Sequence, residues 1–175
     1  MCYNSISYHD ERSVSTMAEE KTNVMRLLDQ KKIPYTPHTY DVSDGALDGV
    51  TAAARLGVAP ETCFKTLVTV GGSKRNHVFV IPVEKELDLK AAARAAGEKS
   101  IEMLKQAQLF PLTGYIHGGC SPLGMKKRFE TVIDASAENL SEMTVSAGKI
   151  GRQVTLFPRD LAALAGASFA AVTRA

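Results

Sequence analysis

The chain has 175 residues, of which 45% are hydrophobic and 23% are charged, so it has enough apolar material for one packed core and does not read as a disordered protein. The net charge of +2 disfavours a protein that wraps long duplex nucleic acid, although a local basic patch would suffice to touch a nucleic-acid end. The three cysteines form no CxxC pair, and we expect a reducing, cytoplasmic environment without a disulfide framework.

The N-terminal residues 1–19 are rich in serine and charge and show neither helical nor strand periodicity, so we predict a disordered tail followed by one domain over 20–175. Translation starting at Met17 is an alternative. The first 16 residues lack the apolar centre of a secretory signal. The longest apolar run, 161–172, is shorter than the about 20 residues of a membrane helix, and we expect no membrane segment.

The first half of the chain predicts helices alternating with strands. In chain order we expect a helix from Thr22 that stops before Pro34, a strand over 35–41, a helix over 47–56 ended by Gly57, strands over 64–70 and 77–83 joined by a turn at 71–73, and a helix capped by Asp88 that runs through Ala96.

The second half is richer in strands. We expect a short helix over 103–108 that ends at Pro111, strands over 113–117, 130–134, 143–146 and 153–157, and a helix from Pro158 through Ala165. This mixture predicts a single α+β domain in which helices pack outside a mixed, curled sheet.

The motifs of common cofactor and metal sites are absent from the sequence. It contains no GxGxxG, no GxxxxGK[ST] and no HExxH, and its four histidines are not spaced with cysteines as in zinc sites. Gly119-Cys120-Ser121 begins a segment like a nucleophile elbow, but the second glycine comes one residue late. We therefore predict no cofactor and no metal.

Lys65 lies near the start of an otherwise apolar strand, in Phe64-Lys65-Thr66-Leu67. A charged side chain on the inner face of a sheet is costly unless it meets an anion, and a substrate phosphate or carboxylate would provide one. The alternative is a lysine that points to solvent from an edge strand.

A glycine-rich segment, GYIHGGCSPLG at 114–124, follows the predicted short helix. Gly118 and Gly119 would let backbone N–H groups approach a ligand and polarise an ester carbonyl, and Ser121 would add a hydroxyl. The alternative is a flexible turn between elements.

Two cationic segments are candidates for contacts with nucleic-acid phosphate. Lys126 and Lys127 directly follow the glycine-rich segment, and Lys149 lies in the predicted hairpin turn VSAGKIGR at 145–152. Each segment has a plainer interpretation as a solvated surface. Cys63 and Cys120 flank the candidate motifs, and we interpret them as buried core residues in preference to catalytic thiols.

Taken in order, FKTL at 64–67, GY at 114–115 with GGCSPLG at 118–124, and SAGKIG at 146–151 resemble the YbaK/EbsC proteins, which are aminoacyl-tRNA deacylases related to the editing domain of bacterial prolyl-tRNA synthetase. The likeness extends from about Lys21 to the C-terminus. It implies the YbaK-like fold, a mixed and partly barrel-like sheet surrounded by helices. It also implies trans-editing in protein biosynthesis, namely the removal of cysteine from mischarged tRNA(Pro).

The resemblance also implies roles for individual residues. The matching positions are Lys65 as the key lysine, Gly118, Gly119 and Ser121 as the loop near the ester, Tyr40 as a lining residue, and Asp134 as a functional acid. Cys120 stands where relatives often carry an apolar residue, which affects the expected pocket size.

In the mechanism that the family implies, the cysteinyl thiol of the substrate attacks its own ester, and no metal or cofactor takes part. The expected partners are the acceptor end of tRNA(Pro) and, for tRNA selection, prolyl-tRNA synthetase. Two alternatives stay open: an Ala-tRNA(Pro) deacylase that uses water, and a non-catalytic binding module of the EbsC type.

Overall fold

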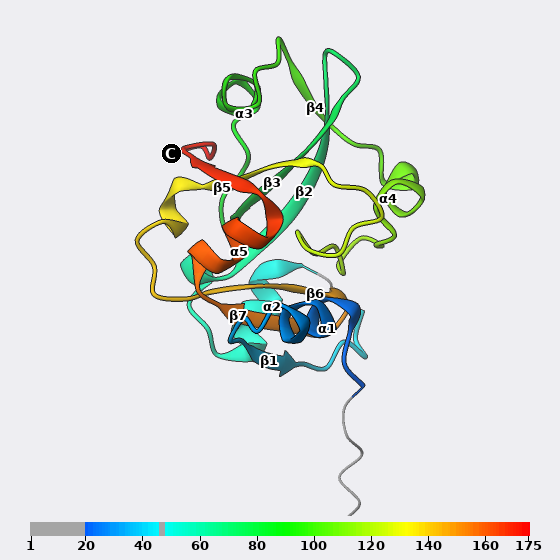
Figure 1. The fold of residues 1–175 in the computed structure, drawn as a ribbon, viewed down its shortest axis with the longest axis vertical. Coiled ribbons are helices and arrows are strands. Elements are labelled where there is room, and N and C mark those ends of the chain that lie inside the picture. Colours follow the sequence, from blue (N-terminus) through cyan, green and yellow to red (C-terminus); the bar gives the residue numbers. More distant parts are fainter. Residues whose placement is uncertain (1–19, 46–47) are drawn as a thin grey trace, which may run out of the picture.

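The computed structural model describes residues 20–45 and 48–175 (Figure 1). The expected tail over 1–19, the start at Met17 and the beginning of the predicted second helix at Leu47 lie outside these residues. Within the described ranges the helices are α1 (Asn23–Gln30), α2 (Gly49–Leu56), α3 (Leu89–Ala95), α4 (Gln106–Thr113) and α5 (Pro158–Ala165), with 3-10 turns η1 (Pro60–Thr62) and η2 (Ala135–Ala137). None of these helices is long and apolar enough to cross a membrane.

The strands form two sheets. A three-stranded antiparallel sheet has the order β1-β7-β6, from β1 (Thr36–Thr39), β7 (Arg152–Leu156) and β6 (Met143–Lys149). A five-stranded mixed sheet has the order β4-β2-β3-β5-β8, from β4 (Ile101–Met103), β2 (Phe64–Gly71), β3 (Asn76–Pro82), β5 (Glu130–Asp134) and β8 (Ala167–Ala170).

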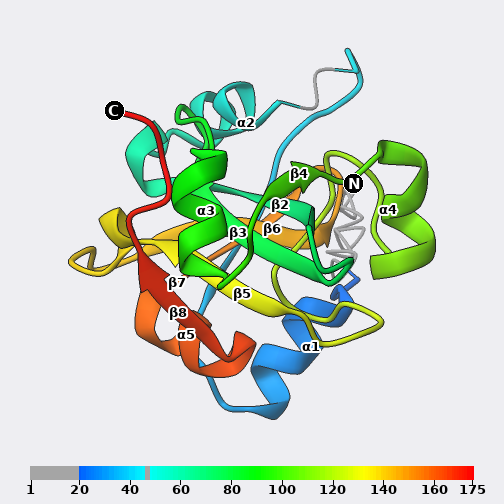
Figure 2. The same ribbon diagram turned by 90° about the horizontal axis from the view of Figure 1, so that it is seen from above.

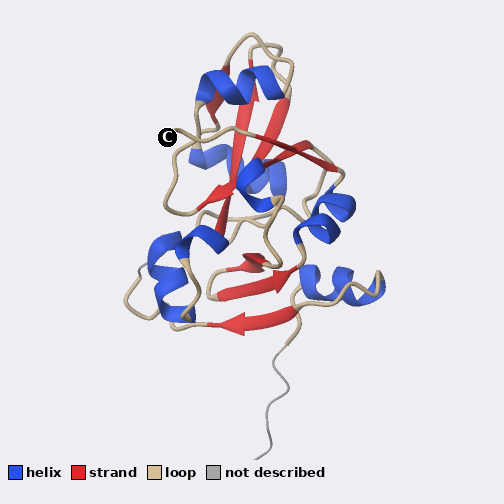
Figure 3. Ribbon diagram, turned by 90° about the vertical axis from the view of Figure 1, so that its left-hand side faces the viewer, coloured by secondary structure: helices blue, strands red, loops and turns tan. Residues whose placement is uncertain are grey.

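The α+β class and the mixed sheet surrounded by helices are confirmed, but the strands do not form one continuous curled sheet. In the described part, only the isolated bridge between Cys63 and Thr144 joins the two sheets through the backbone. Figure 3 shows the smaller sheet below the larger one, with helices around both. Apolar side chains between the sheets keep their backbones apart, so no closed barrel forms.

The core occupies both faces of the larger sheet. Val78 and Val80 of β3 point into the main core, where they meet α1, α5 and the smaller sheet. The alternate residues Phe79 and Ile81 point the other way and pack against the alanines of α3, which covers that face in Figure 2. This alternation follows from the two-residue period of a strand, and it makes β3 a near-continuous apolar run.

The predicted β2–β3 hairpin is confirmed, and it carries Lys65 into the sheet. Lys65 lies opposite Ile81, and Thr66 lies opposite Val80. The hairpin therefore has one end near the smaller sheet, at Lys65, and another at its turn, where Gly71 accepts from the Lys74 N–H. Figure 1 shows this hairpin rising away from the smaller sheet.

The predicted strand over 113–117 is wrong, and so is the expected end of the short helix at Pro111. Helix α4 continues past Pro111 to Thr113 and ends at Gly114, which adopts a φ of 83°. The Thr113 hydroxyl donates to the Leu109 carbonyl and the Gly114 N–H donates to the Phe110 carbonyl, so local caps outweigh the one hydrogen bond that proline removes.

Two short edge strands were not predicted. β4 and β8 are only three and four residues long, and each has a single strong strand former, Ile101 and Phe169, beside residues such as Glu, Ala and Ser. β8 pairs with β5 in parallel, and β4 pairs with the end of β2. Their neighbours in the sheet, rather than their own sequences, make them strands.

Candidate active site

A cavity of about 380 Å³ opens beside the start of β2. Its walls come from separate parts of the chain: the residue after β1, the N-terminus of α2, the first half of β2, the loop that follows α4, and strands β6 and β7. The lining includes Tyr40, Asp48, Gly49, Val50, Lys65, Thr66, His117, Gly118, Cys120, Ser146 and Gln153. The lysine of β2 and the first glycine of the paired glycines thus share one hollow, although 53 positions separate them in the numbering.

Lys65 places a half-buried ammonium group in this cavity. Its Nζ donates to the carbonyl of Val83 at 3.1 Å, and it has no carboxylate within ion-pair distance in the described ranges. Burial lowers the pKa of the Lys65 amine, and the charge of Glu86 acts in the opposite direction. A cation with one neutral partner can bind an anionic or carbonyl group of a ligand at low cost.

Thr66 contributes a buried hydroxyl that lacks a partner. Its Oγ1 is shielded from solvent and makes no hydrogen bond, although the residue lines the cavity. A buried polar atom without a partner costs on the order of 1–3 kcal/mol. A ligand that hydrogen-bonds to Thr66 would recover this free energy. Nothing in the sequence distinguishes Thr66 locally from the other strand threonines, so a role for it could not be predicted.

The paired glycines form a β-turn over 116–119. The Gly119 N–H donates to the Ile116 carbonyl at 3.0 Å, and Gly118, the third residue of the turn, has a φ of 84°. A positive φ at that position favours glycine. The Gly119 amide is therefore already hydrogen-bonded within the turn. The expectation that both glycine amides face the ester does not hold for Gly119. Of the two, Gly118 lines the cavity.

Close packing explains the other glycines of the motifs. A Cβ on Gly119 would lie 3.1 Å from the Ile150 nitrogen, so a side chain there would crowd the β6–β7 hairpin turn. A Cβ on Gly124 or Gly148 would lie 2.8 Å from Tyr115. Tyr115 is buried and donates its hydroxyl to the Leu123 carbonyl at 2.6 Å, which ties the glycine-rich loop together.

Comparison with known proteins identifies the family. The model of the aminoacyl-tRNA editing domain matches residues 45–164, which include Lys65 and the glycine-rich loop. The chain belongs to this family. The chain is also 44% identical, over 89% of its length and 94% of the relative, to the Enterococcus faecalis protein named "Putative Cys-tRNA(Pro)/Cys-tRNA(Cys) deacylase EbsC". The protein is thus a member of the YbaK/EbsC group and an aminoacyl-tRNA deacylase.

Solved structures share the fold of this editing domain. A structure described as "a putative trans-editing enzyme for prolyl tRNA synthetase" matches with a TM-score of 0.75 and 22% identity, over 87% of this chain and 95% of that chain. The hypothetical protein APE2540 matches with a TM-score of 0.78 and 22% identity, over 86% of this chain and 99% of that chain.

Ser121 and Asp134 lie behind the site of the editing domain and not in its cavity lining. Ser121 is fully buried, and its Oγ accepts the Leu123 N–H at 3.3 Å. Asp134, 4% exposed, accepts the N–H groups of Ser136 at 3.1 Å and Val172 at 3.0 Å. Their hydrogen bonds hold the glycine-rich loop and the C-terminal segment.

None of the three candidate lysines lines the cavity. Lys126 lies over the ring of Phe110, with 4.9 Å from Nζ to the ring centre. Lys127 lines a separate groove beyond α4. Lys149 is exposed at the hairpin turn against which Gly119 packs. Their positions suit contacts with parts of a substrate that extend out of the cavity.

The two cysteines near the site are poor nucleophiles. Burial raises the pKa of the Cys63 thiol to about 11 and that of Cys120 to about 12, so both are protonated at neutral pH. Cys63 is fully buried and its thiol approaches the Gln153 side-chain oxygen at 3.6 Å. In the described ranges, no group of three His, Cys, Asp or Glu side chains is arranged to hold a metal ion.

Proposed function

We propose that the protein is a trans-editing deacylase that removes cysteine from Cys-tRNA(Pro). The observation that carries this proposal is the cavity itself, whose lining residues include an ammonium group without an anion, a buried hydroxyl without a partner, and a cysteine whose thiol is protonated at neutral pH. Such a site suits a substrate that supplies its own nucleophile. The name of the Enterococcus faecalis relative supports the same amino acid.

In the proposed reaction, the sulfur of the cysteinyl group attacks its own ester carbonyl. The new S–C bond closes a four-membered thiolactone, the bond from that carbon to the terminal ribose oxygen breaks, and the thiol proton ends on the ribose hydroxyl. Free tRNA leaves, and water then opens the thiolactone to cysteine. An intramolecular attack of this kind needs mainly orientation, which a preformed cavity provides.

Lys65 would stabilise the negative charge that develops on the ester oxygen or hold the terminal nucleotide. The Gly118 amide would donate to the same oxygen, while Thr66 and Tyr40 would hydrogen-bond to the polar groups of the aminoacyl adenosine. Gly119, Ser121 and Asp134 would support this arrangement from behind through their own contacts with the loop and the C-terminal segment.

A cavity of about 380 Å³ can hold the aminoacyl end of a tRNA, but it cannot also contact the distant anticodon. We therefore propose that Lys126, Lys127 and Lys149 bind acceptor-end phosphates and that prolyl-tRNA synthetase supplies further selection of tRNA(Pro). tRNA charging takes place in the cytoplasm, where we place the enzyme.

The test is a deacylation assay with tRNA(Pro) carrying cysteine, S-methylcysteine, serine or alanine, with and without prolyl-tRNA synthetase. S-methylcysteine is the matched control, because it keeps the sulfur and removes the nucleophile. We expect rapid release of cysteine alone. Rapid release of alanine would instead indicate water attack and an Ala-tRNA(Pro) deacylase, and the absence of any release would indicate a binding module.

A further inference from the structure

A second hollow of about 610 Å³ lies on the other side of α4, and we call it the α4 groove. Its lining consists of Val70, Lys74, Asn76, Leu104, Ala107, Gln108, Pro111, Leu112 and Lys127. We propose that the α4 groove binds the sugar-phosphate backbone of the acceptor strand while the aminoacyl end of the same tRNA occupies the cavity. This inference rests on the proposed function and adds a binding site to it.

The charge of the α4 groove suits a polyanion. Lys74 comes from the β2–β3 turn and Lys127 from the segment after the glycine-rich loop, so the fold brings two distant cations to one hollow. Neither lysine forms an ion pair within residues 20–45 and 48–175, and no lining residue is acidic. Glu98, the nearby buried carboxylate, is engaged by Ser73 and His77. Glu102 is exposed on β4, opposite Val70, and does not line the groove.

The polar and apolar lining also suits a nucleic acid. Lysine ammonium groups contact phosphates as point charges, and side-chain amides donate to phosphate and ribose oxygens. Gln108 is exposed at the groove, where its amide is accessible. Val70 and Leu112 provide apolar surface on which riboses or bases can rest.

The α4 groove and the cavity are neighbours along one strand. Thr66 lines the cavity and Val70 lines the groove, and the two residues lie on the same face of β2, about 13 Å apart at 3.3 Å per residue. Helix α4 separates the hollows, with Leu109 facing the cavity and Leu112 facing the groove. A stacked strand covers about 13 Å with roughly four nucleotides at 3.4 Å each. The single-stranded 3′ tail of a tRNA can thus link the two sites.

The test compares two double charge reversals in the full chain. Lys74→Glu with Lys127→Glu alters the α4 groove, and Lys31→Glu with Lys90→Glu is the matched control, since these exposed lysines lie in neither hollow. The substrates are Cys-tRNA(Pro) and 3′-O-cysteinyl-adenosine, which occupies the cavity only. Binding of uncharged tRNA(Pro) is measured in parallel by fluorescence anisotropy over a range of salt concentrations.

We expect the groove variant to raise the KM for Cys-tRNA(Pro) by about 10-fold or more. Its kcat and its turnover of cysteinyl-adenosine should stay within about 2-fold of those of the unaltered enzyme. The number of counterions released on tRNA binding, measured from the salt dependence, should fall by about one to two. The control should change each quantity by less than about 2-fold. Equal effects of both double variants, or an unchanged KM and tRNA affinity, would overturn the proposal.

Other outcomes separate this proposal from the function on which it rests. If the unaltered enzyme cleaves neither substrate, the deacylase proposal fails, and the anisotropy measurement alone decides whether the α4 groove binds tRNA. If the groove variant binds tRNA normally and loses only stimulation by prolyl-tRNA synthetase, the groove docks a protein and our inference is wrong.

Discussion

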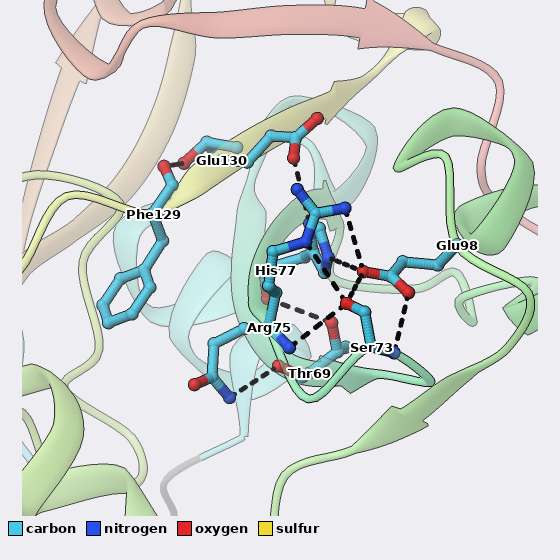
Figure 4. Close-up of polar contacts among 9 residues, drawn as sticks. Thr69, Ser73, Arg75, His77, Glu98, Phe129 and Glu130 are labelled. Atoms are coloured by element: carbon cyan, nitrogen blue, oxygen red, sulfur yellow. Dashed lines mark hydrogen bonds and ion pairs between the residues drawn. The ribbon is translucent and has the colours of Figure 1, made fainter.

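Ionisable side chains are wholly or partly buried at both ends of the β2–β3 hairpin, but their partners differ. At the turn, the side chains of His77 and Glu98 are 1% and 3% exposed (Figure 4). Glu98 accepts from the Ser73 N–H at 3.1 Å, meets His77 Nε2 at 3.0 Å, and pairs with Arg75 at 3.2 Å. His77 Nδ1 lies 3.4 Å from a Glu130 carboxylate oxygen, within ion-pair distance although not aligned for a hydrogen bond.

At the other end, near the smaller sheet, Lys65 has a single carbonyl partner and Thr66 has none. The difference indicates a structural role for the charged groups at the turn and a functional role for those near the smaller sheet. A buried charge whose hydrogen bonds are filled by the protein stabilises the fold. A buried charge whose partners are missing has capacity left for a ligand, and here that charge lies in a cavity.

The largest effect is expected for Lys65→Ala. It should lower kcat/KM for Cys-tRNA(Pro) by about 100-fold or more, because the site loses its cation, while the melting temperature changes little. Steady-state deacylation and thermal unfolding measure the two quantities. If Lys65→Ala instead unfolds the protein and retains activity per folded molecule, the lysine is structural and the contrast between the two ends disappears.

Glu98→Gln should lower stability and leave activity unchanged, which is the reverse of the result expected for Lys65→Ala. Removing the carboxylate from the network at the turn should lower the melting temperature by on the order of 5 °C and leave kcat/KM unchanged at temperatures where the variant is folded. Circular dichroism on heating gives the first quantity. A selective loss of activity in the folded variant would connect this network to the cavity and would contradict the assignment.

The same carboxyl predicts a pH dependence of stability. Hydrogen bonds from Ser73 and His77 lower the pKa of Glu98 from 4.5 to about 2. Because the folded-state pKa is depressed, the stabilisation is fully present above pH 4.5 and is lost as the pH falls toward about 2. The difference in unfolding free energy between the unaltered protein and Glu98→Gln should therefore shrink over this window in denaturant titrations. A difference that stays constant down to pH 2 would contradict the role of Glu98.

Thr66→Val should lower kcat/KM by about 10-fold without loss of stability, because the substituted hydroxyl has no partner in the free protein. Thr69→Val, on the same strand, is the matched control, since the Thr69 hydroxyl is buried and donates to the His77 carbonyl at 3.0 Å. The control should lose about 1 kcal/mol of stability and keep its activity. Identical behaviour of the two variants would mean that Thr66 does not contact the substrate.

The smallest effect is expected for Asp134→Asn. The amide keeps the size of the side chain but weakens the hydrogen bonds that Asp134 accepts from Ser136 and Val172, so stability should fall by about 1 kcal/mol with kcat/KM unchanged. Urea denaturation and deacylation assays measure the two outcomes. A large loss of activity in a folded variant would place Asp134 in contact with the substrate.

Several features of the site were accessible from the sequence. A lysine in an apolar strand is unusual in itself, and the glycine-rich segments stand out by composition, so Lys65 and Gly118, which line the cavity, could be selected as candidates. The roles of Gly119, Ser121 and Asp134 were not predictable in the same way. Their hydrogen-bond partners and close contacts lie at Ile116, Ile150, Leu123 and Val172, and no local pattern shows which backbone groups are already taken.

By itself, the sequence determined the local elements: Thr22 and Asp88 cap helices, β2 and β3 form a hairpin, and a lysine and paired glycines mark the site. These features depend on neighbours within a few residues, where propensity and periodicity act. The tertiary structure alone decided that the strands divide into two sheets, that 113–117 is not a strand, and that the buried hydroxyl of Thr66, a residue that lines the cavity, has no partner. Those outcomes depend on which distant groups satisfy each buried polar atom and each exposed strand edge, and that is a property of the whole fold.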